Sequence, residues 1–178
     1  KYQVKTAETI WQARRKCPCL VVVPPDFSLY VRCSAAFLDI LKEYEARYPW
    51  KFRAIQSYEN RRQGGARNMG LEAARGTWVG FVASDDWTAY DMYEKLVRKA
   101  EETGADVVGC DYNMTSVQSM QIGKVVPNNT MDQTGILNRD KYALLVMNPG
   151  SMVIKIYARE VIEVNHLRFP EKTFYEDN

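Results

Sequence analysis

Apolar residues along the chain alternate between short continuous runs and runs with three- and four-residue spacing. The first pattern is typical of buried strands and the second of amphipathic helices. We therefore expect strands over residues 20–23, 52–55, 77–82 and 106–110. We expect helices over residues 6–16, between Ser34 and Pro49, over 66–75, between Met92 and Gly104, and over 141–147 and 158–164.

Turn and cap residues divide these elements. Pro24-Pro25 stops the first strand, Ser34 is suited to cap the helix that follows, and Gly76 is suited to a left-handed cap after residue 75. Residues 114–135 are polar and contain Gly123 and Pro127, which predicts a long loop that is either functional or mobile. Alternating strands and helices indicate an α/β domain with a largely parallel sheet and helices on both faces.

Composition narrows the class of protein. The chain has 178 residues, 46% of them hydrophobic, with 24 Lys and Arg against 22 Asp and Glu. This length suits one domain, and the near-neutral charge argues against a nucleic-acid partner. No apolar run approaches the roughly 18 residues of a membrane span. The chain starts at Lys1 rather than Met and stops at Glu176-Asp177-Asn178, from which we expect a fragment of a longer protein.

The cysteines and the single histidine give little sign of a reactive site. Cys17 and Cys19 are too closely spaced for an ordinary disulfide, and no second Cys or His pair completes a zinc site. We therefore expect reduced thiols. His166 is expected in a surface turn rather than in catalysis.

An acidic pair, Asp85-Asp86, follows the predicted strand 77–82. The carboxyl ends of strands are where open α/β sheets bind ligands. Adjacent carboxylates repel each other unless a cation lies between them, and oxygen ligands favour Mg²⁺ or Mn²⁺, which often bind substrate phosphates. The alternative interpretation is a simple turn or helix cap, which such a pair often forms.

A glycine turn, Gly64-Gly65, precedes a helix expected to begin near Arg67. Backbone amides, the positive helix end and a guanidinium would then face one ligand, as a phosphate requires. The sequence has neither GxxxxGK[ST] nor GxGxxG, so a P-loop and a dinucleotide site are excluded. Together with the acidic pair, these features favour a metal-bound phosphate ester.

The stretch from Asn60 to Trp87 resembles the inverting family-2 glycosyltransferases of the GT-A fold, whose members read roughly NxGxxxARNxGLxxAxGxYxxFxDSDDW. The residues in register are Asn60, Gly65, Ala66, Arg67, Asn68, Gly70, Leu71, Ala74, Gly76, Phe81, Ser84, Asp85, Asp86 and Trp87. A second resemblance follows later in the chain, in the order that the family has. It covers Lys155-Ile156-Tyr157, Leu167-Arg168-Phe169-Pro170-Glu171 and Tyr175-Glu176-Asp177-Asn178.

The resemblance implies a GT-A-type, Rossmann-like α/β/α sandwich with a central, mostly parallel sheet. It implies one glycosyltransferase-like domain over 1–178, with the donor-binding part at about 1–112 and a truncated acceptor and catalytic-base part at about 113–178. By resemblance, Asp86 and Asp85 hold a divalent cation, Mn²⁺ or Mg²⁺, and Asp85 also contacts the donor. Asp177 resembles the catalytic base, and Glu176 supports it or contacts the acceptor. Gly65, Arg67 and Asn68 belong to the donor-binding motif.

Two departures from the family pattern bear on this assignment. Ala83 replaces the first acid of the family's Asp-x-Asp-Asp, and the Asp-Asp-Gly-Ser that follows the family's second strand is absent. The run from Leu20 to Asp26 fits either the first or the second family strand. In both alignments Asp26 is the candidate contact to the nucleotide base.

The resemblance implies transfer of a sugar, with inversion, from a nucleotide-sugar donor, with a UDP-sugar favoured. The acceptor would be a glycan or a lipid-linked molecule in cell-surface polysaccharide synthesis. The expected location is cytoplasmic, and the alternative is a peripheral position at the inner face of the membrane. The alternative function is a degenerate, non-catalytic module that binds a carbohydrate or a protein partner.

Overall fold

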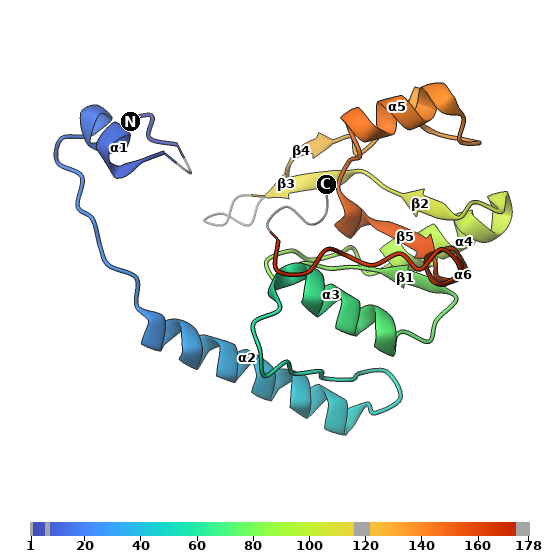
Figure 1. Cartoon of the computed structure of the whole chain (residues 1–178), viewed down its shortest axis with the longest axis horizontal. Helices are drawn as coiled ribbons and strands as arrows, with labels where there is room; N and C mark the ends of the chain where they lie inside the picture. Colours follow the sequence, from blue (N-terminus) through green and yellow to red (C-terminus); the bar gives the residue numbers. More distant parts are fainter. Residues whose placement is uncertain (1, 6–7, 116–121, 174–178) are drawn as a thin grey trace. The chain divides into compact units, whose positions relative to one another are not determined.

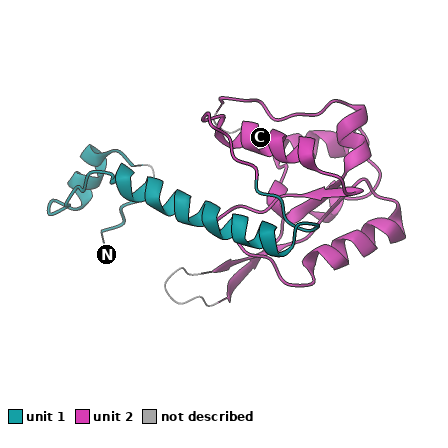
Figure 2. Ribbon diagram, turned by 90° about the horizontal axis from the view of Figure 1, so that it is seen from below, with its two compact units in different colours: residues 1–54 teal, residues 55–178 magenta. Residues whose placement is uncertain are grey.

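The chain forms two compact units, residues Lys1–Ala54 and Ile55–Asn178, coloured separately in Figure 2. The structure, a computed structural model, describes residues 2–5, 8–115 and 122–173. The two units divide after Ala54. We expected a different division, near residue 112, between a donor-binding part and an acceptor part. That expected division is a functional one, and it stays a prediction.

Unit 1 consists of two capped helices and the segments around them (Figure 1). Helix α1, Ile10–Lys16, begins with a capping box between Thr9 and Gln12. Helix α2, Phe27–Arg47, begins at Asp26, whose side chain accepts a hydrogen bond from the Leu29 amide at 2.9 Å. The expected start at Ser34 is wrong, because the Asp26 carboxylate satisfies the helix's first free amides two turns earlier.

The strands expected at residues 20–23 and 52–55 do not form, and both segments lack regular structure. Their apolar content is strand-like, but a strand is defined by hydrogen bonds to a neighbour. Among the described residues, neither segment is paired with another strand. The error therefore lies in pairing, which a local pattern does not contain.

Unit 2 is built around a three-stranded sheet in the order β1-β5-β2, with β1 at Trp78–Gly80, β5 at Lys155–Ala158 and β2 at Val107–Gly109. Both pairings are antiparallel: Val79 lies opposite Tyr157, and Val108 lies opposite Ile156. Among the described residues, every strand pairing is antiparallel, so the largely parallel sheet that we expected is not observed. Strand β5, which the pattern did not predict, separates β1 from β2 and runs against both.

Helices cover both faces of this sheet, as predicted (Figure 1). Helix α3, Arg62–Ala73, and helix α6, Arg159–Val164, pack on one face, where Leu71, Val79 and Ile162 form a buried cluster. Helix α4, Met92–Thr103, packs on the other face and buries Leu96 and Ala100 against Ile156. Because side chains alternate along a strand, neighbouring residues of β5 contribute to opposite clusters.

The remaining elements lie in and after the segment expected to be a long loop. Strand β3, Tyr112–Thr115, pairs antiparallel with β4, Ile122–Val126, and this hairpin contradicts the predicted loop. Two 3₁₀ turns, at Met131–Gln133 and Met152–Ile154, flank helix α5, Arg139–Met147. Four of the five residues of β4 are exposed, so no alternation of buried and exposed positions marks this strand.

The two glycines predicted at helix ends have different outcomes. The helix α4 ends at Gly104 as expected, and Gly104 caps it in the left-handed conformation with φ of 65°. Gly76 does not cap α3, because that helix ends earlier, with Ala74 in extended conformation as its C-cap residue. Gly76 instead lies in the short turn that leads into β1.

Candidate functional site

A cavity of about 530 Å³ lies in unit 2 between helix α3 and strand β1. The helix contributes one wall, in which Arg67 is the charged residue nearest the middle of the helix. The strand and the two residues after it, Phe81 and Val82, contribute the other wall, and Asp85 and Asp86 come later in the sequence and do not line the cavity. The lining residues are Ala66, Arg67, Gly70, Leu71, Ala74, Arg75, Gly76, Trp78, Val79, Gly80, Phe81 and Val82.

Asn68 joins the two sequence motifs. Its side chain is buried, its Nδ2 donates to the Phe169 carbonyl at 2.9 Å, and its Oδ1 accepts from the Phe169 amide at 2.9 Å. Both ends of the amide are thus used by backbone that lies 101 positions away in sequence. The structure therefore gives Asn68 a positioning role, and the direct donor contact that we expected stays a prediction.

A second contact between the same motifs is the ion pair of Arg61 with Glu171. Arg61 donates from Nη2 to Oε1 at 2.5 Å and from Nε to Oε2 at 3.2 Å, a two-point arrangement. The hydrogen bond from Arg61, followed by that from Asn68, lowers the pKa of Glu171 below its usual value. The start of α3 and the segment after α6 are therefore held together at their charged ends.

Arg67 lies between the cavity and the same segment. Its guanidinium carbon is 5.4 Å from the centre of the Phe169 ring, within the range of a cation–π contact. Phe169 also packs edge-on against Phe81, with ring centres 5.6 Å apart. A half-buried guanidinium beside a cavity is a suitable group to meet an anionic ligand.

The glycine turn predicted before α3 is wrong in position. Helix α3 begins at Arg62, so Gly64 and Gly65 lie inside its first turn and are buried. The Gly65 amide donates to the Arg61 carbonyl at 3.3 Å, which uses the group that we expected to face a phosphate. Gly65 is required for packing, because a Cβ at this position would overlap the Arg61 side chain.

Asp85 and Asp86 lie in an exposed turn after β1, closed by the Asp86 amide donating to the Ala83 carbonyl at 3.2 Å. In the described part of the chain, neither carboxylate has a hydrogen-bond or ion-pair partner, and no cluster of three potential ligands gathers around a metal position. Two free neighbouring carboxylates nevertheless fit Mg²⁺ or Mn²⁺. Such ions bind through one or two carboxylates and complete their shell with phosphate oxygens and water.

The other predicted site residues are not brought to this cavity by any described contact. Asp26 caps α2 in unit 1, where its carboxylate accepts hydrogen bonds from Ser28 and Leu29 that lower its pKa. Glu176 and Asp177, the predicted catalytic pair, lie outside the described residues. His166 is an exposed turn residue, as expected, with φ of 53°.

No role in the site was predicted for Phe169, Arg61 or Tyr157. Phe169 belongs to the quoted Arg-Phe-Pro-Glu motif, so its presence was visible, but its contacts with Asn68 and Arg67 were not. Tyr157 packs against Phe81 beneath the cavity wall, and burial raises its pKa to about 12. A partner in another segment was needed to recognise each of these residues.

Comparison with known proteins shows which family the part of the chain around the cavity resembles. Residues 33–162 match the model of the family described as "Glycosyl transferase family 2", which is more than two thirds of the chain. The chain belongs to glycosyl transferase family 2. The joined motifs on α3 and after α6 therefore lie in and directly beyond a family-2 domain.

Two relatives support this membership. The "Putative glycosyltransferase EpsH" of Bacillus subtilis is 33% identical over 136 residues, which cover 74% of this chain and 38% of that protein. The "Succinoglycan biosynthesis protein ExoO" of Rhizobium meliloti is 28% identical over 131 residues, covering 68% of this chain and 36% of that protein. The chain thus spans less than two fifths of the length of either relative.

The amino-terminal region has a different similarity. Residues 1–53 match the model of the impB/mucB/samB family. Within the chain, 41 residues are 51% identical to "DNA polymerase IV 1" of Bacillus subtilis, covering 23% of this chain and 10% of that protein. The two family matches overlap at residues 33–53. The impB/mucB/samB match ends at residue 53, one residue before the last residue of unit 1.

This division explains the missing family pattern near the amino terminus. Leu20 to Asp26 lies outside the glycosyltransferase match and inside the other one. The segment in which we looked for Asp-Asp-Gly-Ser is therefore similar to another family, which accounts for the absence of that motif.

Among the helices of the described residues, none is long and apolar enough to cross a membrane.

Proposed function

We propose that unit 2 is the donor-binding part of a glycosyltransferase that uses a nucleotide-sugar and a divalent cation. The observation that carries the proposal is the cavity between α3 and β1, with Arg67 in its wall, together with the two free carboxylates of the exposed turn that follows residues 81–83. Family membership implies a GT-A fold, a nucleotide-sugar donor and a glycan acceptor. A UDP-sugar, inversion and a lipid-linked acceptor are finer parts of this proposal.

In this proposal the chain's residues have separate tasks. Asp85 and Asp86 hold Mg²⁺ or Mn²⁺, which would neutralise the diphosphate leaving group when bound. Arg67 orients the anionic donor through its fixed guanidinium plane, and Asn68 keeps the Phe169 segment against the helix. Asp177 accepts the proton of the acceptor hydroxyl as that oxygen attacks the anomeric carbon, with Glu176 placed to support it.

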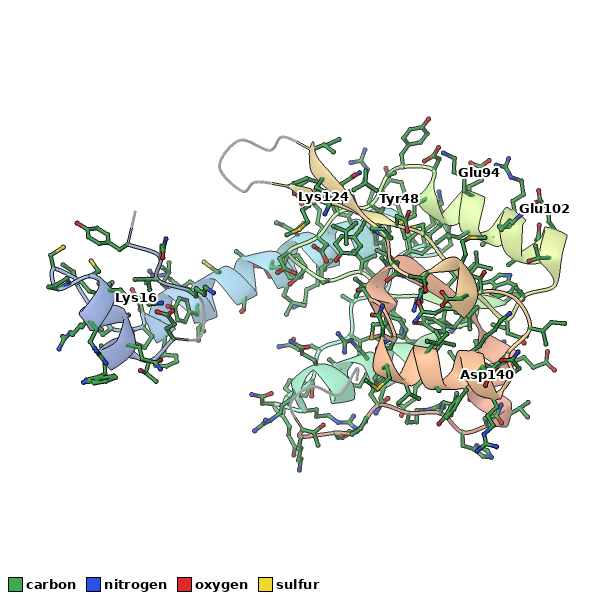
Figure 3. The ribbon with its side chains drawn as sticks, turned by 90° about the horizontal axis from the view of Figure 1, so that it is seen from above. Lys16, Tyr48, Glu94, Glu102, Lys124 and Asp140 are labelled. Carbon is green, nitrogen blue, oxygen red and sulfur yellow. The ribbon has the colours of Figure 1, made fainter. Side chains whose placement is uncertain are left out.

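Binding of nucleotide-sugars to the full chain tests the proposal. Thermal unfolding is measured with UDP-, GDP- and dTDP-sugars, each with and without Mn²⁺, because a ligand that binds only the folded state raises the Tm. One donor class should raise the Tm only when Mn²⁺ is present. Asp86→Asn should abolish this rise, whereas Asp140→Asn, an exposed acid on α5 labelled in Figure 3, should preserve it.

The catalytic assignment needs a separate variant. Asp177→Asn should leave donor binding unchanged and reduce sugar transfer by at least about 100-fold, the usual contribution of a general base. Donor binding that is lost in Asp177→Asn would contradict the division of tasks. Absence of any metal-dependent donor binding in the unmodified chain would refute the donor-site assignment.

A second candidate is a non-catalytic binding module. Two observations favour it: Ala83 replaces one family acid, and residues 1–53 are similar to a different family. This candidate predicts that a carbohydrate binds without any donor hydrolysis or transfer. Measurable donor hydrolysis that disappears in Asp86→Asn would exclude it.

Cellular location and nucleic-acid binding belong to the same set of proposals. We propose a cytoplasmic protein, with a peripheral position at the inner membrane face as the alternative, in polysaccharide synthesis. A relative that matches 41 residues of this chain is named a DNA polymerase, whereas the charge of this chain predicts no nucleic-acid partner. Fluorescence anisotropy with single-stranded and duplex oligonucleotides decides this point, and binding at physiological salt would overturn our expectation.

A further inference from the structure

Two thiols lie side by side directly after helix α1. The Sγ atoms of Cys17 and Cys19 are 3.5 Å apart, although the sequence spacing alone argued against an ordinary disulfide. A disulfide needs a separation of about 2.05 Å, so the sulfurs must approach by roughly 1.5 Å. Side-chain rotation is the motion that brings them together, because the backbone already turns the two side chains toward each other.

The backbone of this turn is fixed at three points. The Cys17 amide donates to the Ala13 carbonyl at 2.8 Å, which attaches the turn to the end of α1. The Leu20 amide donates to the Cys17 carbonyl at 3.0 Å and closes the turn. Between them, the ring of Pro18 holds φ near −65°. These restraints hold the thiols near each other before any bond forms.

The two thiols differ in exposure and acidity. Cys17 is buried, and Cys19 is exposed. The hydrogen bond with Cys17, followed by the contact with the Tyr2 hydroxyl at 4.0 Å, lowers the pKa of Cys19. The hydrogen bond with Cys19, followed by burial, raises the pKa of Cys17. Cys19 is thus the accessible and more acidic thiol, and Cys17 is the sheltered thiol beside it.

We propose that Cys17 and Cys19 form a two-thiol redox site that reacts with small-molecule disulfides and closes a disulfide across Pro18. The Cys19 thiolate attacks one sulfur of the external disulfide, so that a mixed disulfide forms and one thiolate leaves. Cys17 then attacks the Cys19 sulfur, the second external thiolate leaves, and it accepts the Cys17 proton. The protein loses two electrons, and the external disulfide gains them.

The surroundings suit an anionic disulfide such as glutathione disulfide. The last turn of α1 carries Arg14, Arg15 and Lys16, and Lys16, labelled in Figure 3, directly precedes Cys17. Lys16 is paired with Glu8, and Arg15 lies over the Trp11 ring at 4.9 Å. Glu8 offsets the charge of Lys16, so Arg14 and Arg15 supply the net positive charge at the end of the helix where the thiols lie.

The other cysteines are internal controls. Cys33 lies exposed on α2. Cys110 is half-buried, hydrogen-bonds to the Ile154 carbonyl at 3.6 Å, and has a pKa raised by burial. Cleavage after Lys16 and Arg32 gives one peptide, residues 17–32, that contains Cys17 and Cys19 and neither of the others. The state of the pair is therefore measured separately from Cys33 and Cys110.

The test exposes the full chain to graded ratios of glutathione to glutathione disulfide, blocks free thiols with an alkylating reagent, and weighs the peptides. Peptide 17–32 should lose two hydrogens and remain unblocked at ratios where Cys33 is still mostly reduced. Cys19 should be modified before Cys33, because its lowered pKa raises the thiolate fraction more than it lowers nucleophilicity.

Variants separate ring closure from simple exposure. Cys17→Ser should stop the reaction at the mixed disulfide on Cys19, and Cys33→Ser should change nothing in peptide 17–32. The same titration in guanidinium should require a more oxidising ratio, because unfolding releases the turn. Equal closure in the unfolded chain, or two glutathione adducts in place of the ring, would overturn the proposal.

Discussion

Both units of this chain contain regular helices, but the helices of the two units differ in how many apolar residues they bury. In unit 2, α3, α4 and α6 each place at least one buried apolar residue against the sheet. In unit 1, α2 has 21 residues and buries none of them. Its contacts are local: near its end, the Tyr44 ring lies 5.4 Å from that of Phe52, and the Tyr48 ring lies 6.2 Å from it.

This difference shows that the interactions that form a helix are distinct from the packing that stabilises a fold. Asp26 and the sequence of α2 define a helix by local hydrogen bonds, whereas α3 and α4 gain most of their stability from an apolar face. The units also differ in charge, with ten basic and five acidic residues in 1–54 against fourteen and seventeen in 55–178. The chain thus combines a basic helical region with a packed, slightly acidic domain.

The largest expected effect is the loss of the core of unit 2. Ile156, which is 1% exposed, touches the cluster around Leu96 and Ala100, so Ile156→Ala should lower the free energy of unfolding by about 2–5 kcal/mol. Ile40→Ala removes the same atoms from a residue of α2 that is 52% exposed and should change it by about 0.5 kcal/mol or less. Guanidinium unfolding followed by circular dichroism measures both. Similar values would mean that α2 is packed as firmly as the sheet.

Alkaline pH should weaken unit 2 through Tyr157. Burial raises its pKa to about 12, above the value of about 10 in the unfolded chain. The folded state therefore keeps the proton longer, and its stability is complete below pH 10 and lost as pH rises through 12. The loss is roughly 2–3 kcal/mol. Urea unfolding between pH 8 and 12 measures it, and Tyr157→Phe should remove this part of the pH dependence. An identical profile in the variant would contradict the assignment.

The connection between the two motifs is the next effect in size. Asn68→Ala removes both hydrogen bonds to Phe169 and leaves partly buried backbone groups of Phe169 without these partners, which should cost about 1–3 kcal/mol. Asn165→Ala is the control, because its exposed side chain bonds only within its own helix end. Hydrogen exchange at the Phe169 amide should accelerate in the first variant alone. Unchanged exchange there would show that Phe169 is held by its ring contacts.

The smallest effect should come from the cap of α2. Asp26→Ala removes the acceptor for the Leu29 amide and should reduce the helical circular dichroism signal slightly, without changing the unfolding of unit 2. Asp26→Asn, which still caps, should retain the signal. The same pair of variants tests the predicted nucleotide contact. A fall in donor affinity in Asp26→Asn with the helix intact would support that contact.

Much of the site could be predicted from the sequence, and the part that could not depends on distant partners. The Ala-Arg-Asn and Arg-Phe-Pro-Glu motifs were visible as text, and the family match confirms the membership that they indicated. That Asn68 binds Phe169, and Arg61 binds Glu171, was not visible, since more than 100 residues separate each pair. The start of α3 was misplaced because two glycines favour a turn locally, whereas in the structure both lie inside the helix, where a Cβ at Gly65 would overlap Arg61.

The sequence by itself determined the family, the helix positions to within a turn or two, the helix end at Gly104 and the acidic pair after β1. These depend on residue type and short-range spacing, which act within a few positions of the chain. Only the tertiary structure decided that the strands run antiparallel, that residues 20–23 have no strand partner among the described residues, and that Cys17 and Cys19 meet. Strand pairing and thiol contact are set by direction and distance in space, which a one-dimensional pattern does not contain.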